Sequence, residues 1–107
     1  MATMNKILGR VKPDAITNTI LYTVPAGTQA NVNLFIANQG PGEDQVRVAL
    51  TPSGSVLAAT DYIIYNTTIQ GNSSINLTGI ALATGGFITV YSLNGTTSFV
   101  ATGIEIS

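Results

Sequence analysis

Apolar residues in this chain recur at every second position, and this period limits its possible folds more than any other feature. Val32, Leu34 and Ile36 are separated by single residues, and Val46 and Val48 repeat the pattern further along. Side chains two residues apart lie on one face of a β-strand, whereas an amphipathic helix needs a spacing of three or four. No segment holds several turns of helical spacing, so the sequence predicts an all-β protein.

Turn residues divide the alternating segments into about eight short strands. The strongest turn signals are Gly-Pro-Gly at 40–42 and the pair Asn94-Gly95, which is typical of a two-residue hairpin. We therefore expect the strands that flank Asn94-Gly95 to pair with each other. The expected strands are 6–11, 19–24, 30–38, 45–51, 61–68, 73–79, 87–93 and 97–106. This spacing predicts an antiparallel β-sandwich, Ig-like or jelly-roll-like, with a small barrel as the alternative.

The alternation changes phase near Gly79. Ile75 and Leu77 belong to one phase, and Ile80 and Leu82 belong to the other. A bulge or corner at Gly79 would bring both pairs to one face. Residues 55–60 form either one helical turn or a loop. The predicted core consists of Leu21, Val32, Leu34, Ile36, Val46, Val48, Leu50, Ile64, Ile75, Leu77, Ile88, Val90 and Ile104.

The chain length predicts one domain over 1–107, large enough to bury a core without disulfides. The basic residues gather at its front, where Lys6, Arg10 and Lys12 are three of the four cations. Residues 1–12 are then either an edge strand protected by its cations or an N-terminal arm that docks on an acidic partner. These three cations are the candidate docking residues.

The residues that usually carry chemistry are absent or isolated. The chain has no His and no Cys, which excludes the usual catalytic triads and thiolate metal sites. Glu43 and Asp44 are adjacent, so they point to opposite faces of a strand and only polarise the end of a turn. Asp44 or Asp61 with Asn side chains could bind Ca²⁺, but the loop pattern for that ion is missing. We expect no enzyme, no catalytic residue, no cofactor and no metal.

Tyr62 and Tyr65 are the candidate aromatic contacts. Tyrosines can form a platform that stacks sugars or bases, but they also fit a half-buried strand or anchor a subunit contact. The net charge is −1, which does not favour nucleic-acid binding. No apolar run approaches the ~20 residues that span a bilayer, so we expect no membrane partner.

Charged residues make up only 8% of the chain, against about 25% in ordinary soluble domains. Either Thr, Asn and Ser solvate the surface, or other subunits cover much of it, since interface cores are depleted in charge. The second interpretation predicts a homo-oligomer, for which we expect a trimer.

Six segments, in order along nearly the whole chain, carry a family resemblance. They are KILG at 6–9, LYTVPAGT at 21–28, VNLFIAN at 32–38, VRVAL at 46–50, DYIIY at 61–65 and GIEI at 103–106. The chain resembles small virion structural proteins of tailed bacteriophages. The most specific segment is LYTVPAGT, in which a strand ends before Pro25 and Gly27 turns the chain.

The resemblance implies a β-sandwich subunit that oligomerises on the virion, without specifying its place there. We expect a capsid-decorating or cement protein whose partner is the major capsid protein. Lys6, Arg10 and Lys12 would then dock on an acidic capsid lattice. Such a protein assembles in the bacterial cytoplasm and needs no signal peptide, and we expect none in this sequence. The alternatives are a tail, neck or fibre component and a carbohydrate-binding module for host attachment.

Overall fold

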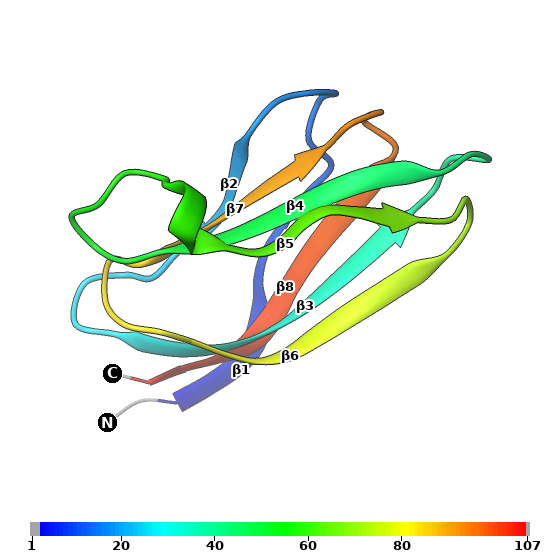
Figure 1. Ribbon diagram of the computed structural model, residues 1–107. Helices are drawn as coiled ribbons and strands as arrows, with labels where there is room; N and C mark the ends of the chain where they lie inside the picture. The colour runs from blue at the N-terminus through cyan, green and yellow to red at the C-terminus, as the bar shows by residue number, and fades with distance from the viewer. Residues whose placement is uncertain (1–2, 107) are drawn as a thin grey trace.

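The computed structural model describes residues 3–106, with side chains described from residue 6 onward (Figure 1). Residues 1, 2 and 107 of the predicted domain lie outside this part. The elements are β1 (Thr3–Val11), β2 (Thr19–Thr23), β3 (Gln29–Asn38), β4 (Asp44–Thr51), the 3₁₀ turn η1 (Ala59–Asp61), β5 (Tyr62–Ile69), β6 (Ser74–Leu82), β7 (Phe87–Ser92) and β8 (Thr97–Ile106). The eight predicted strands are therefore present, with β6 running three residues further than expected.

The strands form two four-stranded antiparallel sheets that pack as a sandwich, which confirms the predicted fold class. One sheet has the order β1-β8-β3-β6 and the other has the order β2-β7-β4-β5. The pairs β1–β8, β2–β7, β3–β6 and β4–β5 are nested, as if one long antiparallel hairpin had been rolled up. This nesting is the jelly-roll arrangement, one of the two sandwich types that the sequence predicted.

The hairpin predicted at Asn94-Gly95 is wrong. β7 and β8, which flank this pair, belong to different sheets, so the loop crosses from one layer of the sandwich to the other. Gly95 has the positive φ (72°) that such a turn residue favours, but its neighbour is the β1–β2 loop, where Ala15 lies against it. The turn at Asn94-Gly95 was predicted correctly from its own residues, but the pairing of the two flanking strands was not.

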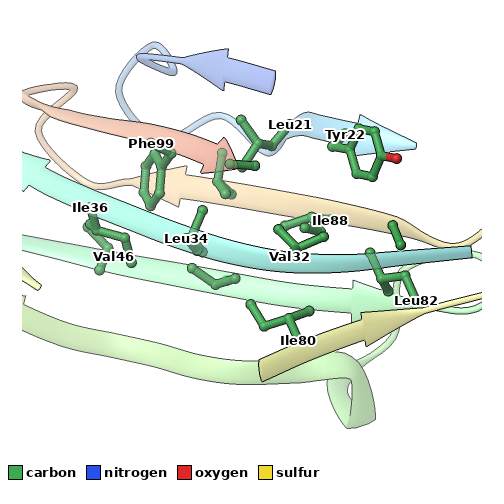
Figure 2. Close-up of a cluster of buried hydrophobic side chains, with 14 of the residues drawn as sticks. Leu21, Tyr22, Val32, Leu34, Ile36, Val46, Ile80, Leu82, Ile88 and Phe99 are labelled. Atoms are coloured by element: carbon green, nitrogen blue, oxygen red, sulfur yellow. The ribbon is translucent and has the colours of Figure 1, made fainter. Parts of the chain in front are cut away.

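The core lies between the sheets and is made by the alternating inward residues of both (Figure 2). Leu34, Ile36 and Val46 are fully buried, and the predicted Leu50 and Leu77 pack on the margin of this cluster. Eight of the thirteen predicted core residues are buried, namely Leu21, Val32, Leu34, Ile36, Val46, Val48, Ile88 and Val90. Leu50, Ile64, Ile75 and Leu77 are partly buried against them.

The placement of Ile104 in the core is wrong. β8 buries Phe99 and Ala101, and successive side chains of a strand point to opposite faces, so Ile104 faces outward. Both phases of β8 carry apolar residues, so the alternation did not show which phase faces the core.

A bulge at Gly79 confirms the predicted change of phase. Val32 pairs with Ile80 and Leu34 pairs with Leu77, so β6 carries one residue more than β3 between these rungs. Gly79 has a φ of 76°, which glycine adopts without a steric cost. Ile80 and Leu77 consequently share the inner face.

Candidate functional site

Two outer sheet surfaces and a cluster of buried polar residues are the candidate functional features. We call the outer surface of the first sheet the β8 face. It is formed by Ile7, Arg10, Gln29, Asn31, Asn33, Phe35, Ala37, Ser74, Asn76, Ala81, Ser98, Val100, Thr102, Ile104 and Ile106, which the strand registers place on one side. Arg10 is the one charged residue among these described positions.

Exposed apolar side chains stand on the β8 face among amides and hydroxyls. Ile7 is 60% exposed and Phe35 is 45% exposed. Phe35 lies directly opposite Val100, and Ile7 lies directly opposite Thr102 on the same strand. The middle of this face is therefore an uncharged strip with large apolar side chains.

The three candidate docking cations do not form one patch. Residues 3–11 form the edge strand β1 rather than a detached arm. Lys6 lies opposite Gly103, in the inward phase, and its Nζ forms an ion pair with Glu105 at 2.8 Å. Arg10 lies opposite Val100 on the β8 face, and exposed Lys12 follows the end of the strand. Only Arg10 and Lys12 border a common shallow pocket, so Lys6 stands apart from them.

Glu105 joins Lys6 to the buried Tyr22, whose hydroxyl donates to this carboxylate. The bonds from Lys6 and Tyr22 hold the pKa of Glu105 below its usual value. Burial and the bond to Glu105 raise the pKa of Tyr22 well above its usual value. The charge of Lys6 is thus paired within the protein, and its role in docking stays a prediction.

We call the outer surface of the second sheet the β4 face, and it contains the two candidate tyrosines. Tyr62 and Tyr65 meet edge to face, with ring centroids 5.0 Å apart and an interplanar angle of 79°. Both rings line an open pocket of about 520 Å³, which Leu57, Ala58 and Ala59 complete. The structure therefore brings together the two residues that the sequence proposed as an aromatic contact.

Arg47 and Tyr91 extend this cluster, although the sequence analysis had neither among its candidate contact residues. The Arg47 guanidinium lies 4.5 Å from the centroid of the Tyr65 ring and 4.4 Å from that of Tyr91. Its Nε donates to Asn66 Oδ1 at 2.7 Å. Arg47 pairs with Tyr91 across β4 and β7, a register between distant segments that no local pattern indicates.

The buried Asp44 is a structural centre rather than a turn-polarising residue, which corrects the sequence interpretation. Its carboxylate accepts from the hydroxyls of Ser92 and Thr97 and, at 2.9 Å each, from the backbone N–H groups of Gln45 and Asn94. These bonds hold its pKa below the usual value, although its burial acts in the opposite direction. Burial and these four bonds give Asp44 a structural role between β4, β7 and β8.

The buried side chain of Asn38 likewise connects the adjoining loops through hydrogen bonds. Its amide donates to the carbonyls of Gly42, Ile69 and Gln70, and its oxygen accepts from Gly40 N and Thr96 Oγ1. Like Asp44, it connects strands from both sheets.

Within residues 3–106, no group of three His, Cys, Asp or Glu side chains could hold a metal ion. No helix in the same part of the chain is long and apolar enough to cross a membrane. No protein-family model, curated protein or solved structure gives a significant match to this chain. The surfaces and contacts of the molecule are therefore the basis for a functional proposal.

Proposed function

We propose that this chain is a non-enzymatic structural subunit of a tailed-phage virion, most specifically a capsid-decorating protein that acts as a homo-oligomer. In this role it stabilises the shell because it binds the assembled lattice and not the free capsid protein. The virion is thus its proposed location, and the major capsid protein and further copies of the chain are its proposed partners.

The β8 face, with Arg10 as the one charge among its described residues, is the observation that carries this proposal. A surface with exposed Ile7 and Phe35 among amides and hydroxyls, and with Arg10 as its charged residue, has the composition of an interface core. Four strands about 4.8 Å apart and about 30 Å long present on the order of 600 Å². That area is close to the ~800 Å² that each partner buries in a stable complex, with flanking loops to add the remainder.

The fold supports the proposal by analogy. Jelly rolls are common in viral capsid proteins, although they also form lectins and cupins. The six segments that resemble phage virion proteins favour the first of these uses. Arg10 and Lys12, which border one pocket, replace the predicted trio of cations as the docking residues to test first.

Native mass spectrometry and density-gradient sedimentation test the proposal. We expect the purified chain to be an oligomer, with a trimer as the specific prediction, and to sediment with intact particles from its source. A monomer that stays at the top of the gradient would contradict it. Immunogold labelling then distinguishes a capsid location from the tail, neck or fibre.

Two matched variants test the β8 face itself. Phe35→Glu introduces a charge into the proposed interface, and Thr68→Glu introduces the same charge at an exposed position of the other sheet. We expect the first variant to become monomeric and the second to keep the parent mass. If both variants keep that mass, the interface lies elsewhere.

A second candidate function is a carbohydrate-binding module for attachment to the host. The corner formed by Tyr62 and Tyr65 beside an open pocket is the observation that favours it. Binding to a glycan array that disappears in Tyr62→Ala and Tyr65→Ala would support this function.

A further inference from the structure

We propose that the β4 face binds an acidic oligosaccharide, with Arg47 holding a sugar carboxylate and the Tyr62–Tyr65 corner holding a neighbouring sugar ring. The inference names the ligand class of the carbohydrate-binding function and rests on that second candidate. It is independent of the capsid-decorating role.

Arg47 is held in place as a carboxylate receptor. The guanidinium lies over the rings of both Tyr65 and Tyr91, and its Nε donates to Asn66 Oδ1. The hydrogen bond found for this side chain uses Nε, so the N–H donors of both Nη atoms have no partner found among the described residues. These donors form the planar fork that matches a carboxylate, and their ordering lowers the entropic cost of binding.

Among residues 3–106, no carboxylate is found paired with this fork. Within the described part of the chain, the ion pair found is that of Lys6 with Glu105 on the other sheet, and the hydrogen bond found for the Arg47 side chain is that to Asn66. A positioned cation without an anionic partner is complementary to an acidic ligand.

The aromatic corner indicates a sugar rather than a base. The rings of Tyr62 and Tyr65 meet at 79°, so they form two walls of a corner and not a parallel slot into which a flat base could slide. Tyr65 is 57% exposed, whereas Tyr91 is only 8% exposed. A sugar ring can lie on the open face of one tyrosine, with Leu57, Ala58 and Ala59 as the apolar floor.

The charge of the β4 face favours a sugar over a nucleic acid as its ligand. Nucleic acids are bound by several cations that follow the phosphates. The β4 face offers Arg47 alone, which suits a ligand with one carboxylate at this point. Because Tyr65 is the wall shared by the pocket and Arg47, the ligand needs at least two linked sugars.

Calorimetric titration and an array of carboxylated oligosaccharides, each printed beside its carboxyl-reduced counterpart, test this inference. We expect at least one acidic oligosaccharide to bind, and its reduced counterpart to bind at least tenfold more weakly. Arg47→Gln should weaken the acidic ligand at least tenfold and abolish the preference over the reduced form. Arg10→Gln removes the same charge from the other sheet and should change affinity less than twofold.

Arg47→Lys keeps the charge without the planar fork, so it should also lose most of the affinity even if Arg47→Gln is poorly folded. The thermal unfolding midpoint of each variant checks the fold. Silence across the acidic array overturns the inference, as does an equal loss in Arg47→Gln and Arg10→Gln. An array without signal together with an altered oligomer mass in Arg47→Gln would assign Arg47 to a contact between copies instead. Particle binding by wild type is a separate readout, so failure here leaves the capsid-decorating proposal standing.

Discussion

The two ends of the sandwich are built differently, although the same eight strands reach both. The latched end comprises the loops 12–18, 39–43, 70–73 and 93–96 (Figure 1). There the buried side chains of Asn38 and Asp44 bond across loops and sheets. At the open end, which comprises the loops 24–28, 52–58 and 83–86, the cross-loop bonds between Thr28 and Thr84 are exposed.

The difference indicates that the latched end is the more rigid part of this fold and that the open end presents an accessible surface. A buried polar group must bond within the protein, so Asn38 and Asp44 hold the loops 39–43, 70–73 and 93–96 together. The open end has fewer such bonds, among them that of the buried Thr51 hydroxyl to Asp61. Its loop 52–58 carries Val56, which is highly exposed, and contributes Leu57 and Ala58 to the pocket beside Tyr62 and Tyr65.

The largest expected effect comes from two carboxylates, one at each end. Asp44→Ala leaves the four donors that bond Asp44 without an acceptor inside the protein, which we expect to cost about 3–5 kcal/mol of unfolding free energy. Asp61→Ala removes bonds from Thr51 Oγ1 and Ala58 N near solvent and should cost about 1 kcal/mol. Urea denaturation measures both. Equal losses would mean that the ends are alike.

Acid should weaken the latched end first. The native pKa of Asp44 is below its value in the unfolded chain, so the unfolded state binds more protons as the pH falls. Its contribution is present above about pH 4, the unfolded pKa, and is lost as the pH falls through the native pKa. Asp44→Asn should therefore show a smaller loss of stability than wild type between pH 5 and pH 2, by urea titration. The lowered pKa of Glu105 adds in the same direction, so Glu105→Gln is the control for the other end.

Through Tyr22, the stability of the protein should fall as the pH rises, whereas through Asp44 it falls as the pH decreases. Because the native pKa of Tyr22 is raised, its contribution is complete below the unfolded value of about 10 and is lost as the pH rises toward the native value. Tyr22→Phe should cost about 1 kcal/mol at neutral pH and should flatten the fall in stability above pH 10. Tyr65→Phe, on an exposed side chain, is the comparison. If the unfolding free energy falls equally steeply above pH 10 in wild type and in Tyr22→Phe, Tyr22 is not the group responsible.

The smallest effect should come from the Lys6–Glu105 ion pair. The Lys6 side chain is 44% exposed, and ion pairs near solvent contribute about 0–1 kcal/mol. Lys6→Met should therefore change the unfolding free energy by less than about 1 kcal/mol, and that difference should shrink in 1 M salt. A larger, salt-insensitive loss would show that the open end is held as firmly as the latched end.

The candidate site could be predicted from the sequence only in part. Tyr62 and Tyr65 are close neighbours on one strand, so proposing them together needed only local information. Arg47 and Tyr91 joined them through the pairing of β4 with β5 and β7, which brings together segments far apart in the chain. Lys6, Arg10 and Lys12 were close in sequence, yet strand pairing and a bulge in β1 turned Lys6 inward.

The sequence by itself determined the strands, most of the core and the bulge at Gly79, because side-chain period and turn chemistry act over a few residues. Only the tertiary structure decided which strands pair, that Ile104 faces outward, and that Asp44 is buried. Pairing β1 with β8 closes almost the whole chain into one loop, and many registers satisfy the same alternation. The choice among them depends on how both sheets pack over a shared core, which no local segment contains.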